Sequence, residues 1–285
     1  MDASAKGRVR LWLRSEKAMG LRSLPVRLPE APAAPVPCRA APALTATARP
    51  APVAAARPAQ RPPSVPPPVP AAPPTRVVEP PASPAPAGPE LSREEKTRLL
   101  KDLDERNVKG CTKCRLHETR THTVFGEGDP DAKLLFIGEG PGESEDLSGR
   151  PFVGRAGQKL DEMIGAMGLK REQVFIANIV KCRPPGNRVP ASEEVETCTP
   201  YLLRQIEIIR PRVIVTLGLP ATKYMLNLNL TMGRMRGQWH DWRGIKLMPT
   251  YHPSYILRNY TVETRKAVWS DLQKVMAELG LSARK

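Results

Sequence analysis

The feature that most limits the possible folds of this chain is the alternation of short apolar runs with longer helical patterns after residue 90. Four runs rich in Val, Ile and Leu have the character of buried strands, and they occupy residues 134–137, 174–180, 213–217 and 246–250. Apolar residues at helical spacing predict helices over about residues 92–106, 156–167, 192–209 and 264–279, with a shorter one from about Pro220. Such alternation is typical of a parallel sheet covered on both faces. We therefore predict an α/β fold, a three-layer αβα sandwich with a central four-stranded parallel sheet.

Proline divides the chain into two parts of different character. Of the 33 prolines, 22 lie in residues 1–90, a segment that has no Phe or Tyr and only one tryptophan, Trp12. Such a Pro/Ala/Arg-rich segment cannot bury enough apolar surface to offset the entropy lost on folding. We predict that residues 1–90 are a disordered basic tail and that residues 91–285 form one domain.

The net charge of +15 is spread over both parts of the chain. Residues 1–90 carry 12 basic and 5 acidic residues, a net charge of +7, and the remaining 32 basic and 24 acidic residues give +8. This excess favours a polyanionic partner, and nucleic acid is favoured over membrane because no apolar run approaches the roughly 18 residues of a membrane span. The alternative is a solvated basic surface without a specific partner. We therefore expect a nucleic-acid partner and no membrane.

Residues 6–27 are basic, with scattered apolar positions. They contain no secretory apolar segment of adequate length and no clear cleavage site, so we expect a cytoplasmic protein. An Arg-rich organellar transit peptide is the alternative for this stretch.

Four of the five cysteines form a candidate metal site. Cys111 and Cys114 make a C-x2-C pair, and Cys182 and Cys198 are separated by fifteen residues. In a cytosolic protein this quartet indicates tetrahedral zinc or an iron–sulfur cluster, and spacing alone does not separate the two. Free thiols are the third alternative. We interpret Cys38, alone in the tail, as incidental.

Three polar residues lie near or just past the ends of predicted strands: Glu139, Asn178 and His252. In an open α/β sheet ligands bind at the carboxyl ends of the strands, so we expect these side chains to converge on one rim. Taken singly, each has an ordinary alternative role: a helix cap for Glu139, a turn former for Asn178 and a loop histidine for His252.

The glycine-rich turn after Gly138 leads through a polar loop to Phe152, which lies between Pro151 and Gly154. A turn of this kind could instead cradle a phosphate in a nucleotide-binding regulator. The Lys and Ser/Thr of a P-loop are missing, which counts against that alternative.

Four sequence blocks carry a resemblance to a known family. They are GEGPGESED with GRPFVGRAG, then NIVKCRPPGNRVP followed by Cys198, then TYHPSYILR. Together with the cysteine quartet they resemble the family 4 uracil-DNA glycosylases, the iron–sulfur type, over about residues 100–275. The resemblance implies an enzyme that flips uracil out of DNA and hydrolyses its N-glycosidic bond, leaving an abasic site for base excision repair. We accordingly expect a nucleoid-associated monomer that acts on single- or double-stranded DNA, with a replication or repair partner for the tail.

The resemblance also implies roles for individual residues. Phe152 would stack on the flipped uracil, and the amide of Asn178 would pair with its Watson–Crick edge. His252 would donate a hydrogen bond to O2 of the departing base, and Glu139 would orient the attacking water. The other implied substrate contacts are Gly140 and Glu145, the latter by crowding out a C5 methyl group.

The DNA contacts that the resemblance implies lie in two loops. The loop after His252 would supply a wedge, either Leu257 or Tyr255, together with the contacts of Ser254 and Arg258. The basic loop after the second strand would supply Arg183 and Arg188. The cysteine quartet would hold a 4Fe-4S cluster whose role is structural.

Nearby families differ from this chain in two ways. The crosslinking relatives carry a basic, histidine-containing insertion after the second motif, whereas CRPPGNRVP is short and has no histidine, so we expect hydrolytic turnover. The related family without a carboxylate in the first motif is disfavoured by Glu139. The alternative function is a non-catalytic iron–sulfur DNA-binding module accessory to replication or repair.

Overall fold

The computed structural model describes residues 90–282. Residues 1–89 of the predicted disordered tail, with Cys38 and residues 6–27, lie outside the described residues. Within residues 90–282 no helix combines the length and the apolar character that crossing a bilayer requires.

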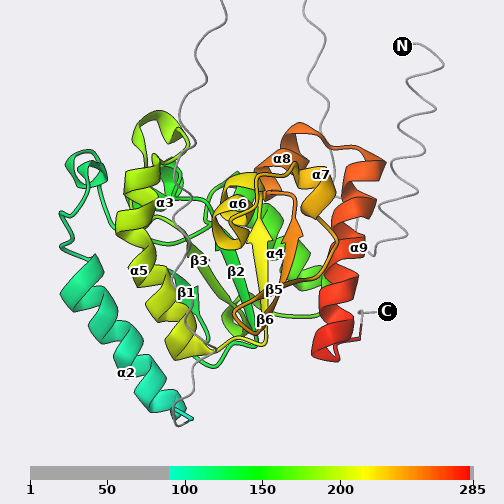
Figure 1. The fold of residues 1–285 in the computed structure, drawn as a ribbon, viewed down its shortest axis with the longest axis horizontal. Coiled ribbons are helices and arrows are strands. Elements are labelled where there is room, and N and C mark those ends of the chain that lie inside the picture. Colours follow the sequence, from blue (N-terminus) through cyan, green and yellow to red (C-terminus); the bar gives the residue numbers. More distant parts are fainter. Residues whose placement is uncertain (1–89, 283–285) are drawn as a thin grey trace, which may run out of the picture. The chain divides into compact units, whose positions relative to one another are not determined.

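The core of the fold is a six-stranded sheet with strand order β1-β3-β2-β4-β6-β5 (Figure 1). Its four central strands are parallel and match the predicted ones; they are β3 (Phe175–Asn178), β2 (Leu134–Gly138), β4 (Val213–Leu217) and β6 (Ile245–Thr250). Two antiparallel edge strands, β1 (Glu127–Gly128) and β5 (His240–Trp242), were not predicted. The α/β fold and the parallel centre are thus confirmed, and the sheet is wider than the four predicted strands.

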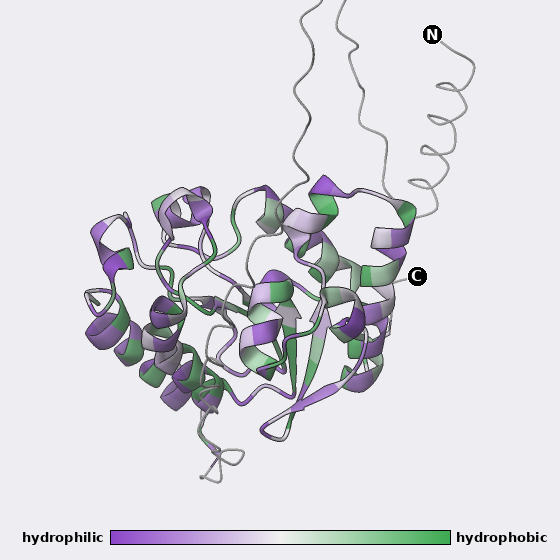
Figure 2. Cartoon of the chain, turned by 45° about the horizontal axis from the view of Figure 1, so that its top comes forward, coloured by the Kyte–Doolittle hydropathy of each residue, from purple (hydrophilic) through white to green (hydrophobic). Residues whose placement is uncertain are grey.

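Helices cover both faces of the sheet, so the three-layer arrangement is confirmed. On one face pack α2 (Arg93–Leu103), α5 (Ser192–Ile209) and α6 (Leu219–Leu226). On the other pack α4 (Arg155–Ala166), α8 (Pro253–Arg258) and α9 (Val262–Leu279). Alternate residues of β2 serve the two cores: Leu135 belongs to the first and Phe136 to the second. The central strands are correspondingly hydrophobic, whereas the helices carry polar residues as well (Figure 2).

The helix ends follow the sequence signals. Ser92 and Glu95 form the predicted capping box, with reciprocal hydrogen bonds of 2.8 and 3.2 Å. Beyond Leu103 the chain continues as a π-helical turn, Asp104–Val108, which buries Val108. Three short 3₁₀ turns complete the connections, at Arg115–Glu118, Arg171–Gln173 and Pro185–Asn187.

Two segments predicted as loops are short helices, and a third short helix, α7 (Met232–Met235), was not predicted. In α3 (Glu143–Ser148) the carboxylate of Glu145 accepts from the Gly142 N–H, and Gly149 ends the helix with φ 71°. The segment after His252, expected to be a loop, forms α8, which begins at Pro253. Caps rather than apolar periodicity define these helices, and so the hydrophobic pattern did not reveal them.

Candidate active site and cysteine-lined cavity

The carboxyl ends of the parallel strands bring the three predicted rim residues to one edge of the sheet. Glu139 directly follows β2, and Asn178 is the last residue of β3, where it is the register partner of Gly138. His252 lies two residues beyond the end of β6. The parallel topology therefore places these three residues on one edge of the sheet, as expected from their positions after the strands.

Gly138 lies among a group of side chains on this rim, Phe152, Asn178 and His252, which together we call the niche. A Cβ atom at this glycine would lie 2.3 Å from Oδ1 of Asn178 and 2.6 Å from Cζ of Phe152. The ring of Phe152 also lies 5.7 Å from the imidazole of His252, between ring centroids. Gly138, Phe152, Asn178 and His252 are thus close neighbours, and a side chain at Gly138 would collide with two of the other three.

The side chain of Asn178 is buried with an unsatisfied acceptor. Only 1% of the residue is exposed, and its Oδ1 accepts no hydrogen bond from any described residue. Burying a carbonyl oxygen without a donor is costly, and such atoms are rare in folded proteins. Because this oxygen lies beside the Phe152 ring, the niche offers an acceptor to a flat ligand that carries an N–H group.

The imidazole of His252 is held as a neutral ring. The backbone N–H of Ser254 can only donate, and it lies 3.1 Å from Nδ1, with the Ser254 hydroxyl at 2.7 Å from the same atom. The proton of the neutral ring is therefore on Nε2. Burial, helped by the charge of Arg258, lowers the pKa of His252 to about 4. The site thus has a neutral N–H donor at physiological pH.

Glu139 is a partly buried carboxylate. Its burial raises the pKa of the side chain above the ordinary glutamate value. Its main-chain oxygen accepts from the Val180 N–H at 3.2 Å, which fixes the turn after β2 against the segment after β3. Gly140, the next residue, packs so closely that a Cβ there would lie 2.7 Å from Cγ2 of Val180.

The carboxylate of Glu145 is engaged by the backbone of its own loop. One oxygen accepts from the N–H groups of Val153 and Gly154 at 2.8 Å each, and the other accepts from Gly142. Glu145 therefore links α3 to the loop that carries Phe152. Its predicted role in rejecting a C5 methyl group stays a prediction.

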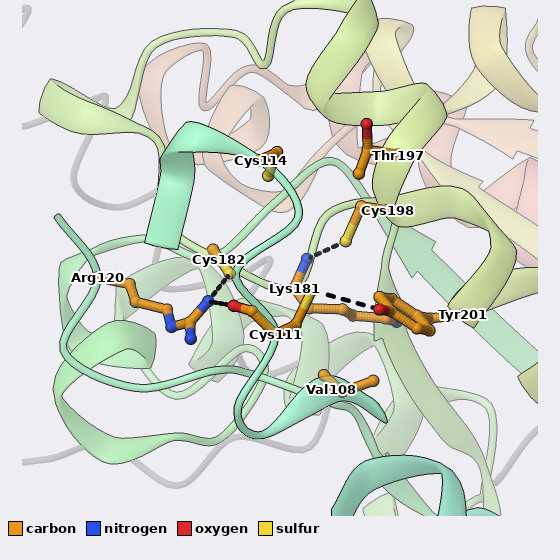
Figure 3. Close-up of a pocket in the computed structure, with 9 residues that line it drawn as sticks. All are labelled: Val108, Cys111, Cys114, Arg120, Lys181, Cys182, Thr197, Cys198 and Tyr201. Carbon is orange, nitrogen blue, oxygen red and sulfur yellow. Dashed lines mark hydrogen bonds between the residues drawn. The ribbon is translucent and has the colours of Figure 1, made fainter. Parts of the chain in front are cut away.

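The four cysteines from the sequence quartet line one cavity (Figure 3). Cys182 and Cys198 are buried, whereas Cys111 and Cys114 are partly exposed. Cys111 and Cys114 precede the first 3₁₀ turn, Cys182 follows β3 and Cys198 lies in α5. The thiols face a shared space, although in residues 90–282 no three His, Cys, Asp or Glu side chains converge closely enough to hold a single metal ion.

Polar groups from outside the quartet contact these cysteines. Nη1 of Arg120 donates to the carbonyl oxygen of Cys111 at 2.7 Å and lies 3.1 Å from Sγ of Cys182. The Tyr201 hydroxyl lies 3.3 Å from Sγ of Cys111. Burial raises the pKa of Cys198 to about 11, so a bound cation would be needed to favour the thiolate. The donor set fits a group that binds four thiolates.

A buried lysine joins this cavity to the rim. Lys181 is 1% exposed, and its Nζ donates to the main-chain oxygen of Asn178 at 2.9 Å and to Oε1 of Gln205 at 2.6 Å. Its backbone N–H lies 3.2 Å from Sγ of Cys198. The cavity and the niche are therefore connected through one side chain.

Comparisons with known proteins agree with this geometry. The model of the Uracil DNA glycosylase superfamily matches residues 125–273. Three similar proteins are named type-4 uracil-DNA glycosylase. The protein from Thermotoga maritima is 50% identical, over 64% of this chain and 94% of its own length. Those from Saccharolobus solfataricus and Archaeoglobus fulgidus are 46% and 44% identical, each over 62% of this chain and over 86% and 92% of their own lengths. The chain belongs to the type-4 uracil-DNA glycosylases.

The matched region of this type-4 glycosylase contains the whole rim, so the family resemblance seen in the sequence blocks is confirmed. The short helix α8 carries the predicted wedge. Within it Tyr255 is 37% exposed and stacks on Tyr251, with ring centroids 4.7 Å apart. Leu257 is partly buried and Arg258 is exposed.

The two predicted arginines of the basic loop have protein partners in this glycosylase. Nε of Arg183 donates to Oδ1 of Asn187 at 2.8 Å. The guanidinium of Arg188 forms two hydrogen bonds with the buried carboxylate of Glu194, at 2.6 and 2.8 Å. Both pairs stabilise the loop, and the DNA contacts of these arginines stay predictions.

Sequence reasoning missed Arg120, Lys181 and Tyr201 beside the cysteines. Arg120 and Tyr201 carried no spacing signal, because an isolated arginine or a helical tyrosine is common. Lys181 did carry one: it is a lysine directly after an apolar run and before Cys182. A buried lysine at such a position requires specific partners.

Proposed function

We propose that this protein is a DNA repair glycosylase that flips uracil out of single- or double-stranded DNA and hydrolyses its N-glycosidic bond, leaving an abasic site. The observation that carries the proposal is the unpaired, buried Oδ1 of Asn178 beside the ring of Phe152. The similarity to proteins named type-4 uracil-DNA glycosylase favours this enzyme over a non-catalytic iron–sulfur DNA-binding module.

Recognition of the base rests on hydrogen-bond polarity. Uracil N3–H would donate to Oδ1 of Asn178, and the side-chain NH2 would donate to O4. Cytosine presents an acceptor and a donor at these positions, so the buried amide would be left unpaired, and discrimination of about 10⁴-fold or more is expected. Phe152 would stack on the base, Gly140 would contact it, and Glu145 would crowd out a C5 methyl group.

The chemistry follows the flow of charge. When the bond between the sugar C1′ and the base N1 breaks, its electron pair leaves with the base and negative charge grows on O2. His252 Nε2–H would donate to that oxygen, an interaction worth roughly 3–4 kcal/mol in the transition state. The carboxylate of Glu139 would stabilise the cationic sugar and orient the water that adds at C1′, and the proton of that water leaves to Glu139 or to solvent.

The cysteine quartet supports a 4Fe-4S cluster, with zinc as the alternative. Cys111, Cys114, Cys182 and Cys198 would hold it, since the four thiols surround a shared space rather than a single point. When bound, the cluster supplies a rigid junction between the segment before the first 3₁₀ turn, the loop after β3 and α5. Arg120 brings positive charge beside the anionic thiolates.

DNA binding would involve α8 and the loop between β3 and α5. Leu257 or Tyr255 would fill the stack that the flipped base leaves, and Ser254 and Arg258 would contact the backbone. Arg183 and Arg188 would contact phosphates from the other side of the niche. Acting as a monomer on chromosomal DNA would place the protein at the nucleoid in the cytoplasm.

An oligonucleotide assay tests the proposal. Full-length protein is incubated with single- and double-stranded oligonucleotides that contain one uracil, and alkali then cleaves at abasic sites. We expect cleavage at uracil and none at cytosine or thymine, with hypoxanthine measured in parallel. A uracil oligonucleotide that is bound normally but stays intact after the alkali treatment would contradict the proposal. A covalent protein–DNA product would contradict hydrolytic turnover.

A further inference from the structure

The backbone of Phe152 has an unfavourable conformation. Its φ is 50°, in the left-handed region that a bulky L-residue rarely adopts, because Cβ approaches its own main chain. The residue is nevertheless 6% exposed, with its ring beside Gly138 and His252. Surrounding contacts must therefore hold the backbone in place.

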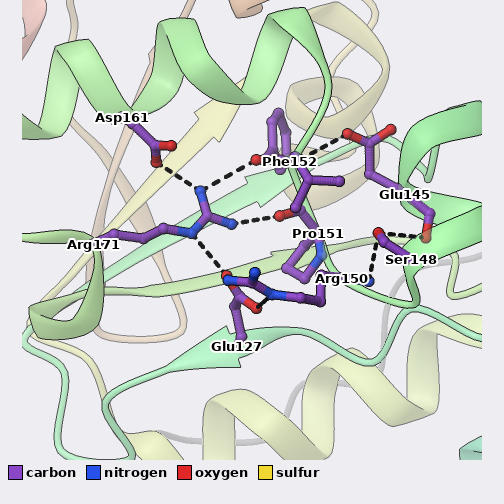
Figure 4. A network of polar contacts seen from close by, with 9 residues as sticks. Glu127, Glu145, Ser148, Arg150, Pro151, Phe152, Asp161 and Arg171 are labelled. Atoms are coloured by element: carbon purple, nitrogen blue, oxygen red, sulfur yellow. Dashed lines mark hydrogen bonds and ion pairs between the residues drawn. The ribbon is translucent and has the colours of Figure 1, made fainter.

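The main restraint is the side chain of Arg171 (Figure 4). Its guanidinium donates to the main-chain oxygens of two consecutive residues, Pro151 and Phe152, the latter at 3.2 Å. The guanidinium is itself fixed by two carboxylates, Glu127 at 2.7 Å and Asp161 at 2.7 Å. The planar fork of arginine allows all four contacts at once, which a lysine ammonium could not reproduce.

The surrounding contacts leave the loop little freedom. Glu127, in the edge strand β1, also binds Arg150 through two hydrogen bonds of 2.8 and 3.1 Å. On the far side of the ring Glu145 accepts from the next two backbone N–H groups. In α4, a Cβ at Gly157 would lie 1.9 Å from the Phe152 oxygen, so the helix backbone approaches this carbonyl directly.

We propose that Arg171, anchored by Glu127, is a positioning residue for base recognition: it fixes the Phe152 backbone so that the ring is oriented for stacking before DNA binds. The proposal rests on the function given above, because it assumes that Phe152 stacks on the flipped base. Among the described residues the hydrogen bonds of Arg171 reach the niche only through this backbone, so we expect its influence on the reaction to pass through Phe152. An ion pair that only stabilised the surface would not have that property.

A double-mutant cycle in the full-length protein tests this route. The variants are Arg171→Met, Phe152→Ala and the double variant, with Lys96→Met as the matched control. Lys96 is also a buried cation that binds a carboxylate and a main-chain oxygen, those of Asp131 and Ile209, but it lies on α2. Single-turnover excision of uracil and the dissociation constant for an abasic oligonucleotide are measured for each.

We expect Arg171→Met to lower the excision rate at subsaturating enzyme by about 10- to 100-fold in the wild-type background and by less than about 3-fold in the Phe152→Ala background. Affinity for abasic DNA, which has no base to stack, should change by less than about 2-fold. Lys96→Met should leave excision unchanged. If Arg171→Met does not fold, Arg171→Lys serves in its place. We expect its excision rate to stay below that of the wild type, because an ammonium group cannot make all four contacts.

Equal losses in both backgrounds, or wild-type excision by Arg171→Met, would overturn the positioning role while leaving the glycosylase proposal intact. Wild-type excision by Phe152→Ala would instead remove the stacking role on which the inference rests. The two failures are thus distinguishable.

Discussion

At the scale of single residues, we expect Asn178 to matter for activity but little for stability, because its Oδ1 is unpaired among the described residues. We expect Asn178→Ala to lower uracil excision by about 10²- to 10⁴-fold, because the two proposed hydrogen bonds to the base would be lost. The unfolding midpoint should change little, since the substitution removes a buried acceptor that has no partner among the described residues. Thermal unfolding beside the excision assay checks both, and a large loss of stability would contradict this account.

Glu139 should set the acid limb of the pH profile. Its pKa is raised, so the active carboxylate form is lost, and the rate falls, as the pH drops through a value above that of an ordinary glutamate. We expect Glu139→Gln to be slower by about 10²- to 10⁴-fold and to lose this limb. The pKa of His252 is about 4, so its own limb lies lower. An unchanged limb in Glu139→Gln, measured between pH 4.5 and 8, would exclude Glu139 as its source.

Gly138 provides a test of the niche itself. Its φ is not in the left-handed region, so alanine fits the backbone, but the new Cβ would displace Asn178 and Phe152. We expect Gly138→Ala to fold and to lose at least about 10-fold in excision, as expected for a misplaced recognition group. Gly165→Ala is the control, since nothing lies within 4 Å of its Cβ. Equal activity of the two variants would show that the niche is not where the base binds.

At the scale of elements, the parts of the fold with strong hydrophobic patterns were predictable. The strands β2, β4 and β6 are apolar runs, and α5 has both a periodic face and an acidic first turn. The edge strands β1 and β5 are two and three residues long and exist through pairing with distant strands, which no local pattern encodes. The rim residues were found because they follow strands. Arg171 was not, because its partners, two backbone oxygens and two carboxylates, lie at least 10 residues from it in sequence.

The junction of β3, α5 and the segment before the first 3₁₀ turn should depend on the proposed metal centre. We expect Cys182→Ala to lose iron and visible absorption and to lower the unfolding midpoint by at least about 5 °C, because about 1 kcal/mol corresponds to 2–4 °C for a domain of this size. Cys38→Ala is the control and should retain both. A colourless wild-type protein with stoichiometric zinc, from cells grown with ample iron, would refute the cluster.

At the scale of the whole molecule, the basic charge on both parts of the chain bears on DNA binding. Residues 1–90 carry a net charge of +7, and we expect their deletion to leave excision of a saturating substrate intact. The deletion should weaken DNA binding at low salt and reduce the salt dependence of affinity, because fewer counterions are released. Superimposable salt titrations of the full-length and shortened proteins would contradict this prediction.

Lys181, the buried lysine that joins Asn178 to the cysteine cavity, has a consequence for how such a repair enzyme would lose its activity. Only three residues separate Asn178 from Cys182, and Lys181 returns from that end of the chain to hold the Asn178 carbonyl. In the proposed function, damage at the cysteines would therefore disturb first the residue that distinguishes uracil from cytosine. Since the same residue would also be needed for excision, we expect a damaged molecule to lose activity and not to begin removing ordinary bases from DNA.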